Sequence, residues 1–110
     1  MSRKKTPFLP YEGIKATDKH IRITHSMLIS KVFKRLSKSS IILYIYMKDW
    51  ACGRIEFEYP QSLCKDILSS ATFWSCIDEL EQNGFIEVKK RSRLTRYKNI
   101  YRFSSKWNNL

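Results

Sequence analysis

The fold is decided by residues 69–90, which read SSATFWSCIDELEQNGFIEVKK. Apolar side chains recur at helical spacing between residues 71 and 83, so we predict a helix there. Its inward face consists of Phe73, Cys76, Ile77 and Leu80. The pair Asn83-Gly84 is typical of a helix end, and the alternating residues 85–90 predict a strand directly after it.

A second strand is predicted over residues 97–103, and the joining residues 91–96 contain no glycine, so the turn type stays open. Before residue 69, Pro60 suits the first position of a helix, and we expect a short helix over residues 60–68. Its inward residues are Leu63, Ile67 and Leu68. Two short helices with a tight turn, followed by a hairpin, are typical of a helix-turn-helix unit with a wing.

Upstream of this unit, Ser26 is a candidate N-cap for a helix that runs to about Leu36, with Leu28, Val32 and Phe33 facing inward. Residues 41–52 are apolar nearly all round, which favours a buried central helix. Residues 55–59 alternate apolar and acidic side chains and predict a short strand, and residues 21–23 predict another.

The predicted class is therefore α+β, a winged helix-turn-helix with three to four helices plus a C-terminal two-stranded β-hairpin wing. We expect a basic, extended N-terminal arm over residues 1–20, a winged-helix domain over residues 21–104 and a C-terminal tail over residues 105–110. A chain of 110 residues has room for one such domain.

The charge balance points to an anionic partner. The chain has 21 Lys and Arg against 10 Asp and Glu, a formal net charge of +11. A small domain this basic repels itself, so the excess favours a polyanion, with nucleic acid first and an anionic membrane surface second. A merely soluble basic protein is the alternative.

The wing is the strongest functional signal. Six cations fall within ten residues, and no Asp or Glu occurs from Val88 to the C-terminus. The six are Lys89, Lys90, Arg91, Arg93, Arg96 and Lys98. Backbone phosphates would offset their mutual repulsion, whereas a solvated loop is the alternative.

The start of the helix at residues 70–75 is the predicted groove-facing segment. Ser70, Thr72 and Ser75 can bond phosphates or base edges, and Trp74 can stack on sugars or bases. Ser70 can instead be the helix cap, and Trp74 can instead fold onto the domain edge or anchor a protein partner. The helix has no Lys or Arg, which excludes the Arg–guanine contact from it, so we expect modest sequence preference.

Three further charged groups leave alternatives open. Asp78, Glu79 and Glu81 are hypothesised to pair with the wing cations and hold the wing in place. A basic stripe on the first helix would flank the duplex or be a solvated face; it consists of Lys31, Lys34, Arg35 and Lys38. Arg3, Lys4 and Lys5 would enter a minor groove or remain an untethered tail.

No pattern indicates catalysis or a bound cofactor. Cys52, Cys64 and Cys76 form no metal-ligand spacing with each other or with histidine, so we expect free thiols that act as small core residues in a reducing compartment. The chain has no glycine-rich phosphate loop and no nucleophile motif. We therefore expect a non-enzyme without cofactor, metal or small-molecule substrate.

No secretion signal or membrane span is predicted, because the longest apolar run, residues 41–47, is far shorter than the roughly 20 residues that a spanning helix needs. We therefore expect a cytoplasmic protein.

The sequence resembles small winged-helix proteins of bacterial plasmids, phages and integrative elements. The likeness spans about residues 7–107 and lies in the runs IRITHSML (21–28), FKRLS (33–37), LYIYMKDWA (43–51), EFEYP (56–60), NGFIE (83–87) and IYRFS (100–104), with Thr72-Phe and Glu79-Leu. More loosely, it is similar to the N-terminal winged-helix domain of plasmid replication initiators and phage replisome organisers. The resemblance implies DNA binding through the helix around residues 72–75 and through the wing.

Initiators of that kind carry further domains, so the resemblance implies an accessory or regulatory role in replication or transcription of a mobile element. Double-stranded DNA is the expected partner, with a homodimer or a replication or transcription protein as further candidates. The alternative is a winged-helix protein–protein docking module that uses Trp74 and the acidic half of the helix.

Overall fold

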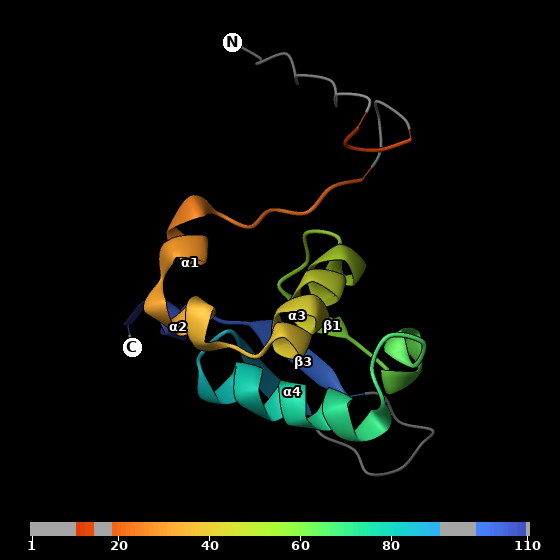
Figure 1. The fold of residues 1–110 in the computed structure, drawn as a ribbon. Helices are drawn as coiled ribbons and strands as arrows, with labels where there is room; N and C mark the ends of the chain where they lie inside the picture. The colour runs from red at the N-terminus through yellow and green to blue at the C-terminus, as the bar shows by residue number, and fades with distance from the viewer. Residues whose placement is uncertain (1–10, 15–18, 91–98, 110) are drawn as a thin grey trace.

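The computed structural model describes residues 11–14, 19–90 and 99–109 of the chain (Figure 1). In this part the fold is α+β, with four α-helices and a three-stranded antiparallel sheet. The α-helices are α1 (His25–Ile29), α2 (Lys31–Arg35), α3 (Lys38–Ala51) and α4 (Ser70–Gln82). The strands are β1 (Glu56–Glu58), β2 (Ile86–Lys90) and β3 (Ile100–Phe103), and two short 3-10 helices are η1 (Gln61–Cys64) and η2 (Lys106–Asn109).

The sheet has the strand order β1-β3-β2. The predicted antiparallel pairing of β2 with β3 is confirmed, with Val88 opposite Tyr101 and a register shift between Val88 and Lys90. The sequence left the strand over residues 55–59 without a partner; β1 pairs with the other edge of β3, places Phe57 opposite Tyr101 and makes the sheet three-stranded. In Figure 1, α3 and α4 lie in front of these strands.

The core lies between the helices and the sheet. The predicted inward face of α4 is confirmed, since Phe73, Cys76, Ile77 and Leu80 are all buried. Leu43 and Met47 of α3 and Phe85 and Tyr101 near the sheet join them. Burying one such large apolar side chain stabilises the fold by about 1.5–3 kcal/mol, so this layer holds the site described below in place.

The cysteines behave differently from one another. Cys64 and Cys76 are buried thiols, as predicted. Cys52 is exposed, so its expected core role is wrong. It ends α3 as the C-cap residue in the left-handed conformation, with φ 51°.

The predicted helix over residues 26–36 is wrong in one respect: it is broken at Ser30. Ser30 has extended backbone, with ψ 142°, and its hydroxyl accepts a hydrogen bond from the N–H of Phe33. Ser30 therefore caps a new helix, α2, while Thr24 rather than Ser26 caps α1. The break also changes the inward face, because Met27 is buried and Leu28 is 49% exposed.

The predicted helix over residues 60–68 is also wrong, because only the 3-10 helix η1 forms. Pro60 has extended backbone and makes no side-chain cap. The carbonyl of Cys64 accepts from the N–H groups of both Ile67 and Leu68, which closes the segment as a turn. Ile67 is 39% exposed and Leu63 37% exposed, so of the three predicted inward residues only Leu68 is buried.

The ends of the described chain also differ from expectation. Residues 21–23 form no strand. Lys19 fastens this segment to α3, since its ammonium lies 3.5 Å from the Asp49 carboxylate and donates to the Asp49 carbonyl at 3.1 Å. The segment expected to be a tail contains η2, and Trp107 stacks on Phe85 with ring centroids 5.8 Å apart. No helix within residues 11–14, 19–90 and 99–109 has the length and apolar character needed to cross a membrane.

Candidate nucleic-acid interface

The start of α4 is fixed by Ser69, not by Ser70. The Ser69 hydroxyl accepts from the N–H of Thr72 at 3.2 Å and donates to the Thr72 hydroxyl oxygen at 2.9 Å. The cap therefore satisfies one of the free N–H groups at the beginning of the helix. The alternative role of Ser70 as the cap is wrong, and its exposed hydroxyl is available for other contacts.

The outer face of the first turns is uncharged. Ser70, Ala71 and Ser75 are exposed, and Thr72 and Trp74 are half-buried. The Trp74 ring meets Phe73 edge-on, with centroids 4.8 Å apart and planes at 82°. One side of the indole is thus packed against the core, and four of these five side chains are small enough to let another surface approach the helix closely.

Tyr59 connects this helix start to the end of the hairpin at which β3 begins. Its ring stacks on Phe73, in the first turn of α4, with centroids 6.2 Å apart and planes at 13°. Its backbone N–H donates to the carbonyl of Asn99 at 3.3 Å, one residue before β3 begins. Burial raises the pKa of the Tyr59 hydroxyl, which keeps it neutral in this contact. The start of β3, where Ile100 pairs with Lys90 of β2, is therefore linked to the start of α4 through Tyr59.

The predicted wing cations are described only in part. Lys89 and Lys90 are exposed at the end of β2. The other four, Arg91, Arg93, Arg96 and Lys98, lie outside the described residues. β2 is fastened to α4 by Glu81, whose carboxylate accepts from the backbone N–H of Val88 at 3.0 Å. This bond fastens β2 to the C-terminal end of α4.

Glu79 does not pair with the wing, and that part of the hypothesis is wrong. Its carboxylate accepts from the N–H and the hydroxyl of Ser37, at 3.2 and 2.8 Å, and from the hydroxyl of Ser40. Burial opposes the charged form, but the hydrogen bonds from Ser40 and Ser37 outweigh it and lower the pKa of Glu79. Glu79 thus joins the middle of α4 to the N-terminus of α3, a contact across 42 residues that no local pattern reveals.

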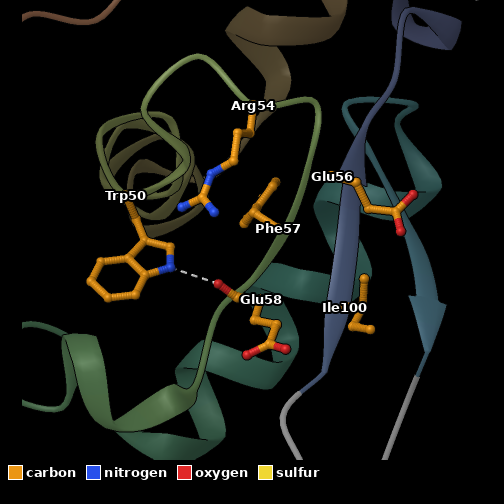
Figure 2. A pocket seen from close by; sticks show the side chains of 6 residues that line it. All are labelled: Trp50, Arg54, Glu56, Phe57, Glu58 and Ile100. Atoms are coloured by element: carbon orange, nitrogen blue, oxygen red, sulfur yellow. Dashed lines mark hydrogen bonds between the residues drawn. The ribbon is translucent and has the colours of Figure 1, made fainter.

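A groove that the sequence did not suggest lies at the β1 edge of the sheet (Figure 2). It is formed where the end of α3 meets β1, and the Trp50 indole donates to the carbonyl of Glu58 at 2.7 Å. Arg54 Nε donates to the carbonyl of Ala51 at 3.2 Å. Arg54 and two exposed carboxylates, Glu56 and Glu58, line the groove, so its charge is mixed.

Within the described part of the chain, no three His, Cys, Asp or Glu side chains gather as a metal site would require. Comparison of the chain with protein-family models, with curated proteins and with solved structures finds no match.

Proposed function

We propose that this chain is a winged-helix protein that binds double-stranded DNA. In this proposal η1 and α4 act as the helix-turn-helix pair, the start of α4 enters the major groove, and the β2–β3 hairpin is a wing along the phosphate backbone. The role that fits best is an accessory or regulatory one in replication or transcription of a mobile element, as the family resemblance implies.

The observation that supports the proposal most is that Tyr59 joins the neutral start of α4 to the cationic end of the hairpin. Exposed hydroxyl groups at Ser70 and Ser75 can approach base edges or phosphates without a charge that must be desolvated. Lys89 and Lys90, which are exposed at the end of β2, would neutralise flanking phosphates and release their counterions.

The proposed readout is weakly selective. α4 contains no Lys or Arg, so it offers no bidentate contact to guanine. Serine and threonine hydroxyls donate or accept and therefore bond several bases. Affinity would come chiefly from the phosphate contacts of the wing.

The docking-module alternative has less support. It would use Trp74 and the acidic half of α4, but Glu79 is engaged with Ser37 and Ser40, and Glu81 with Val88. The indole of Trp74 is already packed in part against Phe73. Under the DNA proposal, Trp74→Ala weakens duplex binding much less than removal of the wing cations does; under the docking alternative, duplex binding is weak throughout.

The test is duplex binding measured at several salt concentrations. With about five phosphate contacts, log Kobs against log salt should have a slope of about −4 to −5. Replacing Lys89, Lys90, Arg91 and Arg93 by alanine should flatten that slope by about 3 to 4.

The matched control removes four cations from elsewhere, with Lys31, Lys34, Arg35 and Lys38 replaced by alanine, and should leave the slope for the first duplex nearly unchanged. Equal slopes for the wing variant and the wild type, or no duplex binding by the wild type, would contradict the proposal.

A further inference from the structure

A second cationic surface exists away from the hairpin. From Lys19 to Lys48 the chain contains seven Lys or Arg and no Asp or Glu. Four of these cations are neighbours on α2 and at the start of α3, and all four are exposed. We call them the α2 basic face: Lys31, Lys34, Arg35 and Lys38.

The four cations of the α2 basic face are not ion-paired. None of their side chains forms an ion pair within the described residues, in contrast to Lys19 with Asp49 and Lys106 with Glu87. One carboxylate, that of Glu79, lies at the start of α3 near Lys38, where its oxygens accept from Ser37 and Ser40. With four exposed cations against this one carboxylate, the face keeps a net positive charge.

Packing places the α2 basic face at the far end of α4. Phe33 of α2 contacts Phe85, which follows the C-terminal end of α4, with ring centroids 5.8 Å apart. Residues 70 and 82 are twelve steps apart, or about 18 Å along the helix axis. In Figure 1, α2 lies beside one end of α4, and η1, which precedes the proposed groove-facing turn, lies beside the other.

The orientation of α2 makes a shared contact with one straight duplex unfavourable. Val32 and Phe33 are buried toward the core, so the lysines and Arg35 on the opposite side of α2 point outward from it. A duplex seated on residues 70–75 and the hairpin would lie at the other end of the molecule. The α2 basic face thus has the charge of a phosphate-binding surface but not the position to serve that duplex.

We propose that the α2 basic face binds a second DNA duplex, so that one molecule bridges two duplexes. This inference rests on the proposed function for the first duplex. A membrane surface fits less well, because interfacial helices insert a broad apolar face, whereas α2 has only five residues and buries Val32 and Phe33 in the protein. Four cations correspond to a salt slope of about −3 to −4 for the second binding event.

The experiment captures a fluorescent duplex on beads that carry a second, identical duplex. It compares the wild type, the wing variant (Lys89, Lys90, Arg91 and Arg93 to alanine) and the α2-face variant (Lys31, Lys34, Arg35 and Lys38 to alanine). We expect the α2-face variant to lose capture at least tenfold while its Kd for a single duplex changes less than threefold. A charge-conserving variant, with the three lysines of the face replaced by arginine, should capture like the wild type.

Several results would overturn the bridging proposal. One is undiminished capture by the α2-face variant, which would mean that two copies of the chain bridge through their wings. Another is no capture by the wild type, with the α2-face variant weaker on a single duplex, which would place both surfaces on one DNA.

A third result that would overturn the bridging proposal is binding to vesicles of phosphatidylcholine and phosphatidylserine that requires the α2 basic face, without capture of a second duplex. Failure of the proposed function has a different signature: the wing variant then binds a single duplex as tightly as the wild type does.

Discussion

Gly84 shows how a single atom limits substitution in this fold. Its backbone has φ +81°, and a Cβ there would lie 2.5 Å from the backbone nitrogen of Trp107. Gly53 has a similar φ of +83° but no atom within 4 Å of such a Cβ. The two glycines therefore separate the cost of a left-handed backbone from the cost of a steric clash.

We expect Gly53→Ala to lower the free energy of unfolding by about 1–2 kcal/mol, the strain of an L side chain in the left-handed region. Gly84→Ala should cost a further 1–3 kcal/mol or so, because η2 must move to admit the methyl group. Urea unfolding of both variants measures the difference. An equal loss of unfolding free energy in both variants would mean that η2 moves aside without destabilising the fold.

Glu79 gives the fold a pH dependence of defined sign. Its pKa is lowered in the folded state, so its stabilisation is complete above the ordinary glutamate pKa and is lost as pH falls through the folded value. We expect Glu79→Gln to lower the free energy of unfolding by about 1 kcal/mol at pH 7, since a charge-assisted bond becomes a neutral one.

The difference between Glu79→Gln and the wild type should shrink below about pH 4.3, the unperturbed glutamate value. Urea unfolding at pH 7, 5 and 3.5 follows it, with Glu56→Gln on the exposed edge strand as the control. A difference that persists undiminished at pH 3.5 would exclude the carboxylate charge as its origin.

At the scale of one residue, the sequence predicts burial where the helical period decides which side chains face the core. Phe73, Ile77 and Leu80 could be assigned to the core because a 3.6-residue period selects one face of a helix. The partners of Glu79 could not, because Ser37 and Ser40 lie about 40 residues earlier in the chain and meet it only after α3 and α4 pack together.

At the scale of the element, capping residues decide where helices begin. Ser69 and Ser70 are identical and adjacent, yet only the Ser69 hydroxyl accepts from the N–H of Thr72. Sequence alone placed the cap one residue too late. In the same way, Ser30 divides a continuous apolar stripe into α1 and α2, since its hydroxyl offers Phe33 a competing partner.

We expect Ser69→Ala to lower the free energy of unfolding by about 1 kcal/mol, which corresponds to a fall in Tm of about 5 °C for a domain of this size. Ser70→Ala should change Tm by no more than about 1 °C, because alanine suits the first turn of a helix. Calorimetry on the matched pair decides the register of the cap. The reverse order of effects would place it at Ser70.

The hairpin was predictable as an element because Asn83-Gly84 and the alternating residues after it are local signals. β1 was predicted as a strand, but its pairing with β3 was not. β1 joins β3 across more than 40 residues, a pairing that depends on how α3 positions Phe57 against Tyr101. The short η1 was mistaken for a longer helix since Pro60 alone does not supply a cap.

At the scale of the whole molecule, the net charge of +11 opposes compaction. We expect Tm to rise as NaCl increases from about 20 to 200 mM, because the Debye length falls from roughly 20 Å to below 10 Å and screens the repulsion. Both four-alanine variants should be more stable than the wild type at low salt and should respond less to added salt. A wild-type Tm that falls on adding salt would show instead that exposed ion pairs dominate.

The indole of Trp50 has a consequence for self-association. β1 is an edge strand whose carbonyl at Ile55 and N–H at Tyr59 are directed toward β3, so by alternation those of Glu56 and Glu58 are directed outward. Trp50 occupies the outward carbonyl of Glu58, and two carboxylates flank the same edge. A neighbouring folded chain that tried to extend the sheet there would meet a filled acceptor and two carboxylates, features that disfavour edge-to-edge pairing of strands.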